Sequence, residues 1–169
     1  MENKPKCSLI LTTYNNVSYL ECSLNSILKQ DQLPDEIIVA DDGSKKDTEE
    51  FITNFNKKCP VPVVHVWHSD EGFQLSKIRN RAIKQAQHPY IIQTDGDLFF
   101  HKRFIKDHIK FARKGYFTRG GRTLLNDSDT QKTITSNTLH LETSKVGKIA
   151  SYYSIPLLRD LFCLLSLPK

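Results

Sequence analysis

Acidic side chains stand directly after two apolar segments of the sequence. Asp41 and Asp42 follow one of these segments, and Asp95 and Asp97 follow another. A carboxylate next to a buried strand is costly unless it binds something. Two carboxylates in a short turn suit a hard divalent cation that keeps positions open for phosphate oxygens. The acids at 95 and 97 therefore favour a metal-assisted site for a ligand that carries phosphate.

Each acidic turn also has a purely structural interpretation. The Asp-Gly-Asp triplet at 95–97 is compatible with an Asx turn and a helix N-cap, and the Asp-Asp-Gly-Ser segment at 41–44 with a cap for the next helix. Asp-x-Asp is weak by itself, and a second copy occurs at 127–129 in a polar stretch. Only the position after a buried strand favours function for the triplet at 95–97.

Hydroxyl, aromatic and cationic side chains complete the set of candidate residues. Thr12 and Tyr14 follow the first apolar run, and Lys77 and Arg79 lie in a segment with helical periodicity. An aromatic ring and hydroxyl groups can hold a nucleobase, carboxylates can hold a ribose and a metal, and cations can balance phosphate. This mixture is compatible with a nucleotide ligand.

The elements that must position these residues alternate between short apolar runs and helical patterns. Strands are expected at 6–12, 36–40, 61–67 and 90–92. Helices are expected after an N-cap at Asn16, after a capping box of Asp47 and Glu50, at 75–86 and at 102–114, with Gly115 as the stop. The alternation predicts an α/β fold whose mostly parallel sheet has helices on both faces. Ligands bind such sheets beyond the carboxyl ends of the strands, where the candidate acids lie.

The composition is that of a globular chain and limits the classes of partner. The 169 residues are 38% hydrophobic and 25% charged, which excludes a mostly disordered or fibrous chain. A net charge of +5 suits an anionic ligand but is too weak to indicate nucleic acid. The sequence has no apolar stretch near the roughly 18 residues of a membrane span and no signal-peptide core. Its four cysteines are scattered. We expect reduced thiols and a cytoplasmic location, either free or at the cytoplasmic face of the membrane.

The histidines and the basic residues carry weaker signals. His65 and His68 are three apart on or just past a strand, so they are expected to point to opposite faces and not to share a metal. His108 is expected at the edge of the core. The basic side chains at 102–114 are expected to form a solvated helix face rather than a membrane-binding one.

The alternation of apolar runs and helical patterns ends after Gly120-Gly121. Residues 122–148 are rich in Thr, Ser, Asn and Asp and predict no helix or strand. Residues 157–167 form a very apolar segment, LLRDLFCLLSL, which covers too much of a helix for a single core stripe. We expect part of that surface to be buried in a dimer or against a membrane. The one candidate domain boundary lies near residue 120.

Four segments together resemble the inverting glycosyltransferases of family 2, which use nucleotide-sugar donors on a GT-A fold. They are LTTYN at 11–15, IIVADDGSKKDT at 37–48, EGFQLSKIRNRAI at 71–83 and YIIQTDGDLFF at 90–100. The first has Thr13 where the family usually has Pro. The third is similar to the chondroitin-polymerase-like and galactosyltransferase-like branches. One such motif is weak, but four in register over about residues 6–120 are strong.

The resemblance implies a nucleobase pocket at the ends of the first two strands. Thr12 and Tyr14 would line it, and Asp42 would receive the ring N–H of the base, with uracil expected and Asp41 beside it. The donor would then be a UDP-sugar, and the acceptor a saccharide or glycolipid, as in polysaccharide biosynthesis.

The resemblance also implies how the diphosphate is held. Asp95 would contact the ribose and Asp97 would ligate Mn²⁺ or Mg²⁺, which bridges the diphosphate. Lys77 and Arg79 would lie near the diphosphate. The implied reaction is a single displacement with inversion, in which a carboxylate base takes the proton of the acceptor hydroxyl.

One departure from the family concerns that base, which is usually a carboxylate in an acidic segment well downstream of the Asp-x-Asp. No such segment follows Asp97, so no catalytic residue is assigned and the base is expected beyond Lys169. Residues 1–120 would be the donor-binding domain and 121–169 the start of an incomplete acceptor-side half, so we expect a truncated chain. A nucleotide-sugar-binding module without turnover is the alternative. A phospho-receiver domain would need its acid pair after the first strand, which ends in Thr-Thr-Tyr.

Overall fold

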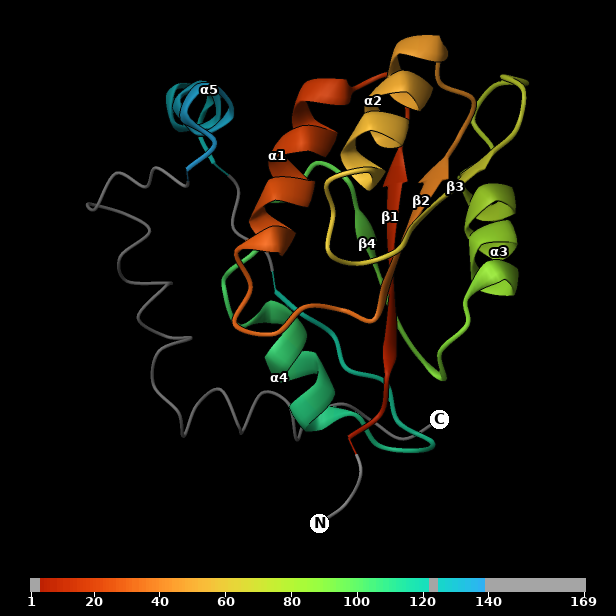
Figure 1. The fold of residues 1–169 in the computed structure, drawn as a ribbon, viewed down its shortest axis with the longest axis vertical. Coiled ribbons are helices and arrows are strands. Elements are labelled where there is room, and N and C mark those ends of the chain that lie inside the picture. Colours follow the sequence, from red (N-terminus) through yellow and green to blue (C-terminus); the bar gives the residue numbers. More distant parts are fainter. Residues whose placement is uncertain (1–3, 122–124, 139–169) are drawn as a thin grey trace. The chain divides into compact units, whose positions relative to one another are not determined.

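The computed structural model describes residues 4–121 and 125–138, and Figure 1 shows its ribbon. The chain divides into two compact units, Met1–Ile109 and Lys110–Lys169. The described strands are β1 (Cys7–Thr13), β2 (Glu36–Asp41), β3 (Val63–Trp67) and β4 (Tyr90–Asp95). The described helices are α1 (Val17–Leu28), α2 (Lys46–Asn56), α3 (Leu75–Gln85), α4 (Phe104–Phe111) and α5 (Asp127–Ser136). Whether the donor and acceptor halves meet at residue 120 stays a prediction.

The four strands form one parallel sheet in the order β3-β2-β1-β4. The two central strands, β1 and β2, are buried along their whole length. A parallel strand that is covered on both faces needs a nearly continuous apolar run, which these two segments supply. The predicted α/β fold with a parallel sheet is therefore confirmed.

Helices cover both faces of this sheet. In Figure 1, α1 and α2 lie on one side of the sheet and α3 on the other. Alternate side chains of β1 divide between the faces: Leu9 and Leu11 pack in the cluster that includes α1, α2 and α4, whereas Ile10 packs with α3. Each fully buried Leu or Ile contributes about 1.5–3 kcal/mol relative to an exposed one. The rigid sheet fixes where its carboxyl ends lie.

The N-terminus of α1 was predicted correctly, and that of α2 was not. Asn16 caps α1, and its side chain accepts a hydrogen bond from the Tyr19 amide at 3.3 Å. The capping box predicted at Asp47 is wrong, because α2 already begins at Lys46, with Lys45 as an N-cap that makes no side-chain bond. Asp47 lies instead in the first turn, where its negative charge suits the helix dipole.

The buried face of α3 is narrow, and the end of α4 differs from the prediction. α3 packs through Ile78 and Ala82, and Ile83 lies outside that stripe and is 39% exposed. Gly115 does not stop α4, which ends at Phe111. It lies in a later turn, where its φ of +83° requires the conformational freedom of glycine.

The unit Lys110–Lys169 contains α5, a helix that the sequence pattern does not predict. Its residues DSDTQKTITS include one large apolar side chain, so they carry no apolar stripe. Asn126 caps the helix by accepting the Asp129 amide at 2.8 Å, and Asn137 follows it in the left-handed region. The apolar segment at 157–167 lies outside the described residues, so its dimer or membrane contact stays a prediction.

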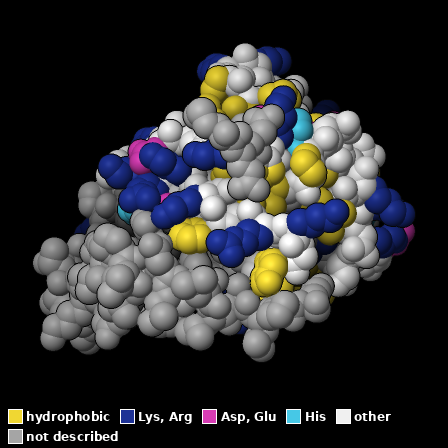
Figure 2. Space-filling view, turned by 90° about the horizontal axis from the view of Figure 1, so that it is seen from below, with side chains coloured by type: hydrophobic (Ala, Val, Ile, Leu, Met, Phe, Trp, Pro, Cys, Tyr) yellow, Lys and Arg dark blue, Asp and Glu magenta, His cyan; other side chains and the backbone are white. Residues whose placement is uncertain are grey.

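Basic side chains are exposed at the end of the sheet where β1 begins. Figure 2 views this end and shows many Lys and Arg side chains with few acidic ones among them. Lys106 and Lys110 are exposed, as predicted for a solvated face of α4, and so is Lys102 before the helix. Among the described residues, no helix is both long and apolar enough to cross a membrane.

Candidate functional site

The carboxyl ends of the strands bring the predicted acids to one edge of the sheet. In the strand register Thr12 lies opposite Asp95, and Thr13 lies opposite Asp41. Asp42 continues from β2, and its amide donates to the Thr13 carbonyl at 3.0 Å. Because β1 lies between β2 and β4, the acids of these two strands flank the end of β1.

Asp95 is held through one of its two carboxylate oxygens. The Thr12 hydroxyl donates to Asp95 Oδ1 at 3.1 Å, and Arg79 Nη2 donates to the same oxygen at 2.7 Å. Neither donor bonds Oδ2, and the Asp95 side chain is 42% exposed. These contacts orient the carboxylate and leave its second oxygen to accept from a ligand.

Asp41 is completely buried and engaged on both oxygens. Oδ1 accepts the Ser44 amide at 2.8 Å, and Oδ2 lies 2.9 Å from His65 Nε2. The bond to Ser44 shapes the turn that follows β2, so for Asp41 the structural interpretation of this acidic segment holds. A direct contact between Asp41 and a nucleotide stays a prediction.

Asp42 joins the two ends of the loop between β3 and α3. Its Oδ2 accepts the Gln74 amide at 3.0 Å, and its Oδ1 lies 3.0 Å from His68 Nε2. The next residue, Gly43, has a φ of +98°, and a Cβ there would lie 2.7 Å from Asp70 Cα. Only glycine therefore lets this turn pack against the loop.

Tyr14 stands at the more exposed part of the same edge. Tyr14 is 51% exposed as a residue, and its hydroxyl donates to Asp70 Oδ2 at 2.9 Å. This hydrogen bond and the charge of Asp70 raise the pKa of Tyr14. The Gly72 amide and then the Tyr14 hydroxyl lower the pKa of Asp70. At neutral pH Tyr14 is thus an uncharged aromatic side chain that a planar ligand can reach.

The turn that carries Asp97 is fastened to β1 and α1. The Gly96 amide donates to the Thr12 carbonyl at 2.8 Å, and the Ser23 hydroxyl contacts the carbonyls of Gly96 and Leu98 at 2.9 and 2.7 Å. Asp97 itself is exposed, and within 4–121 and 125–138 its carboxylate takes part in no hydrogen bond or ion pair. The fold thus holds one uncommitted carboxylate on a fixed turn.

This arrangement fits a metal that is bound together with phosphate. In the described part of the chain, no group of three or more His, Cys, Asp and Glu side chains could hold a metal ion. Mg²⁺ is commonly held by one or two carboxylates, with water and substrate phosphates completing its shell. The exposed carboxylate of Asp97, two residues after Asp95, is a sufficient contribution from the protein to a site of that kind.

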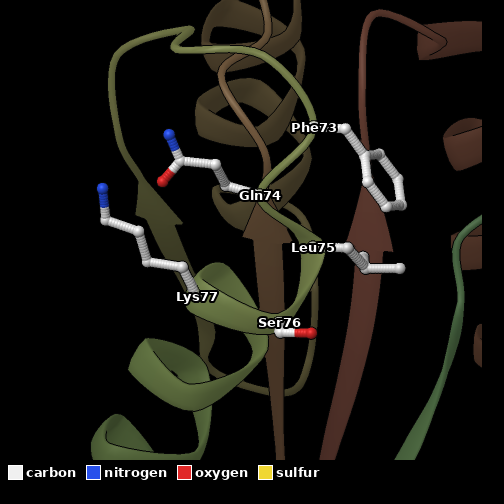
Figure 3. Close-up of a pocket in the computed structure, with 5 residues that line it drawn as sticks. All are labelled: Phe73, Gln74, Leu75, Ser76 and Lys77. Atoms are coloured by element: carbon white, nitrogen blue, oxygen red, sulfur yellow. The ribbon is translucent and has the colours of Figure 1, made fainter.

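The start of α3 forms a pocket that does not include the strand-end acids. Its volume is about 280 Å³, and residues 73–77 line it. In Figure 3 the side chains of Phe73 and Leu75 point to one side of the chain, whereas Gln74 and Lys77 point to the other. Lys77 Nζ pairs with Glu71 at 3.2 Å, so its place near a diphosphate stays a prediction. We place the candidate site at the strand ends because the uncommitted carboxylates lie there.

Several residues that shape this edge were not predicted from the sequence. Ser23 and Ser26 are buried on α1, where their hydroxyls bond the backbone of residues 96–100. Their signal was available, since they interrupt the inward apolar stripe of the helix and buried hydroxyls need partners. His65 and His68 reach two neighbouring aspartates, Asp41 and Asp42, which no residue spacing reveals.

Comparison with known proteins agrees with this geometry. The glycosyl transferase family 2 profile matches residues 8–162, which is nearly the whole chain. The chain belongs to glycosyl transferase family 2. The matched range contains β1 from its second residue, the whole of β2 to β4 and all the candidate acids, so the family assignment includes the site.

Individual relatives match a smaller part. The chain is 30% identical over 104 residues to the chondroitin synthase of Escherichia coli, covering 61% of this chain and 15% of that protein. It is 32% identical over 108 residues to the poly(ribitol-phosphate) beta-N-acetylglucosaminyltransferase TarS of Staphylococcus aureus, covering 63% and 18%. The chain thus spans less than a fifth of the length of these curated relatives.

Comparison with solved structures identifies the fold. A crystal structure of S. aureus TarS 1–349 aligns with a TM-score of 0.54 and 33% identity, over 63% of this chain and 32% of that one. The same part of TarS has been solved with UDP and with UDP-GlcNAc. A mannosyltransferase of Pyrobaculum calidifontis, solved with GDP-Man and Mn²⁺, has a TM-score of 0.60 at 21% identity, which supports the fold alone. The GT-A fold expected from the sequence is confirmed.

Proposed function

We propose that the unit containing β1 to β4 binds the nucleotide-sugar donor of a glycosyltransferase, with a UDP-sugar as the donor and a saccharide or glycolipid as the acceptor. The observation that carries this proposal is the contrast among the strand-end acids. Asp41 has both oxygens engaged by the protein, whereas Asp95 keeps one oxygen uncommitted and Asp97 keeps two. Buried or oriented carboxylates with unused acceptor capacity indicate a ligand.

The roles follow the positions of the side chains. Tyr14 and Thr12 would contact the nucleobase, and Asp42 would accept its ring N–H. Asp95 Oδ2 would accept from the ribose hydroxyls, with Oδ1 kept in place by Arg79. Asp97 would ligate Mn²⁺ or Mg²⁺, and a bound metal would stabilise negative charge on the leaving diphosphate. Arg79 and Lys77 add positive charge near this edge.

The proposed reaction is a single displacement with inversion. The acceptor oxygen forms a bond to the anomeric carbon from one face, while the bond from that carbon to the diphosphate oxygen breaks on the other. The proton of the acceptor hydroxyl passes to a carboxylate base. We assign that base to no described residue, and the described residues would supply donor binding and orientation of the leaving group.

Calorimetry with UDP tests this proposal. UDP should bind the chain only with Mn²⁺ or Mg²⁺, and Asp97→Asn should weaken binding by about 10–100-fold, the range in which metal sites lose affinity when a supporting carboxylate is lost. The matched control is Asp127→Asn, which alters an exposed Asp-x-Asp acid on α5 and should change the affinity less than about twofold. Equal effects of the two substitutions would refute the assignment.

A second assay separates transfer from binding alone. UDP release from UDP-sugars is measured with Mn²⁺, with and without saccharide acceptors. Acceptor-stimulated release supports a transferase, whereas tight UDP binding with no release supports the alternative of a nucleotide-sugar-binding module.

A further inference from the structure

The backbone beside Tyr14 is fixed, but its side chain is loosely packed. The Asn15 amide donates to Ser44 Oγ at 2.8 Å, and Asn15 Oδ1 accepts the Lys45 amide at 2.9 Å. The turn after β2 thus holds the chain directly after Tyr14. Tyr14 belongs to neither hydrophobic cluster of the described residues and is 51% exposed. Packing therefore does little to fix its rotamer, and the contacts of its hydroxyl group decide the orientation of the ring.

Asp70 supplies such a contact from the loop between β3 and α3. The Tyr14 hydroxyl donates to Asp70 Oδ2 at 2.9 Å. Asp70 is itself held in place, because its Oδ1 accepts the Gly72 amide at 3.0 Å and its Cα lies against Gly43, where a Cβ would approach it to 2.7 Å. Gly72 has a φ of +84°, which glycine adopts without strain. The fold therefore orients this carboxylate before a ligand arrives, and its second oxygen meets the tyrosine.

The hydrogen bond between these two side chains is charge-assisted. The Gly72 amide and then the Tyr14 hydroxyl lower the pKa of Asp70, so its carboxyl group is ionised at neutral pH. A hydrogen bond to an ionised acceptor is about twice as strong as one between neutral groups. The Tyr14 proton is committed to this bond, so the side chain offers a ligand its ring but no hydroxyl proton. Exposed polar pairs add little to folding stability, so this one is better explained by what the ring does at the edge of the sheet.

We propose that Asp70 is a positioning residue for the nucleobase, because it holds the Tyr14 ring in one orientation and the base stacks on a ring that is already in place. The inference rests on the proposed function, in which Tyr14 contacts the base. A side chain that must be immobilised during binding costs affinity, and one that is immobilised beforehand does not. Loss of Asp70 should therefore weaken nucleotide binding, although Asp70 itself makes no contact with the nucleotide.

A double-mutant cycle tests whether Asp70 acts through Tyr14. Calorimetry measures the UDP affinity of the full 169-residue chain with Mn²⁺. Asp70→Ala should weaken UDP binding by about 2–10-fold, the range expected when one side chain must be ordered on binding. Tyr14→Phe keeps the ring and removes the hydroxyl, and should weaken UDP binding by the same factor. The double variant should be no weaker than either single variant, because both changes remove the same hydrogen bond.

Glu71→Ala is the matched control, because Glu71 is the neighbouring exposed acid of the same loop. Its carboxylate contacts the side chains of Gln74 and Lys77, and within the described part of the chain it makes no hydrogen bond or ion pair with Tyr14. Glu71→Ala should therefore change the UDP affinity by the same factor in the wild-type and Tyr14→Phe chains, so that these two effects add.

Asp70→Asn separates the position of the ring from the charge beside it. The Asn amide oxygen can accept from Gly72 and its NH₂ group can donate to the Tyr14 oxygen, so this variant should bind UDP more tightly than Asp70→Ala. The hydrogen bond to Asp70 and the charge of Asp70 raise the pKa of Tyr14, and the Asn15 side chain opposes this rise by a smaller amount. NMR of labelled tyrosines, with the signal assigned by Tyr14→Phe, should therefore show a lower pKa of Tyr14 in both Asp70 variants than in the wild type.

Three results would overturn the inference and leave the proposed function in place. They are a wild-type UDP affinity in Asp70→Ala, a loss in Asp70→Ala that adds to the loss in Tyr14→Phe, and a pKa of Tyr14 that stays unchanged without Asp70. Absence of any metal-dependent UDP binding to the wild type would instead refute the proposed function and this inference with it.

Discussion

A single methyl group at Gly96 should displace the turn that carries Asp97. A Cβ at this position would lie 2.7 Å from the Thr12 carbonyl oxygen, whereas ordinary contact begins at 3.4 Å, so the two backbones must separate by about 0.7 Å. Thr12 lies in β1, a central strand held by neighbours on both sides. The turn at 96–97 must therefore move instead.

That movement stretches the hydrogen bonds that fasten the turn. The Gly96 amide bond to Thr12 starts at 2.8 Å, and the Ser23 hydroxyl bonds to Gly96 and Leu98 start at 2.9 and 2.7 Å. Loss of one such bond costs about 0.5–1.5 kcal/mol, and a buried group left unsatisfied costs about 1–3 kcal/mol. We expect Gly96→Ala to lower the free energy of unfolding by about 2 kcal/mol.

The same displacement should weaken metal-dependent binding, because Asp97 moves with the turn. A misplacement of about 1 Å can cost about 100-fold in an oriented site, so we expect a loss of at least about tenfold in UDP affinity with Mn²⁺. Chemical denaturation and calorimetry measure the two effects. The control is Gly120→Ala, where a Cβ meets nothing within 4 Å. Gly96→Ala with the stability and affinity of that control would refute the packing argument.

Three further substitutions test the contacts around the sheet. Arg79→Lys should weaken UDP binding by about tenfold, since a shorter point charge no longer orients Asp95. Arg103→Lys alters a similar ion pair, between the residue before α4 and Asp107 on that helix, and should change the UDP affinity less than about twofold. Glu36→Ala should lower the free energy of unfolding by about 3 kcal/mol, because a buried carboxylate that accepts from two donors is lost. The control Glu50→Ala removes an exposed ion pair with Lys46 and should lower it by less than about 1 kcal/mol. Burial lowers the pKa of His108 from 6.5, so the unfolded chain binds a proton first and the free energy of unfolding should fall as the pH drops below about 6.5. The melting temperature should therefore fall between pH 7.5 and pH 5, and His108→Phe should make this fall smaller. Equal falls of the melting temperature in the wild type and the variant would contradict this role of His108.

The sheet and its covering helices could be predicted from the sequence because their signals are local. The apolar runs of β1 and β2 and the stripe of α1 each lie within a dozen residues. α5 was missed for the opposite reason, since its residues carry caps but no apolar period. The start of α2 was misplaced because the acidic residue at 47 suits both an N-cap and a first turn, and backbone geometry decides between them.

The candidate site was predictable in its location but not in its contacts. Parallel strands bring their carboxyl ends together, so Asp41, Asp42 and Asp95 could be assigned to one edge from the order of the strands alone. Their partners come from distant segments: Arg79 for one acid, and two histidines beyond β2 for the others. Such pairings depend on side-chain geometry across the sheet, which neither spacing nor periodicity records.

The opposite end of the sheet shows what separates a structural acid from one that is available to a ligand. Glu36 begins β2 and is 4% exposed, and its Oε1 accepts the Ser8 hydroxyl at 2.5 Å and the Gln87 amide at 2.6 Å. That carboxylate fastens the loop before β4 to the sheet, as Asp41 fastens the turn after β2. Glu36 and Asp41 are acidic residues next to a strand, and so is Asp97, so the sequence alone does not separate them. The difference is whether a ligand can reach a carboxylate oxygen that the protein leaves unused. Both donors to Glu36 meet Oε1, as both donors to Asp95 meet Oδ1, but Glu36 is buried whereas the Asp95 side chain is 42% exposed. A buried acid that fastens the fold therefore has a structural role. An oriented or fastened acid with unused oxygens, as at 95 and 97, has its remaining capacity available to a ligand.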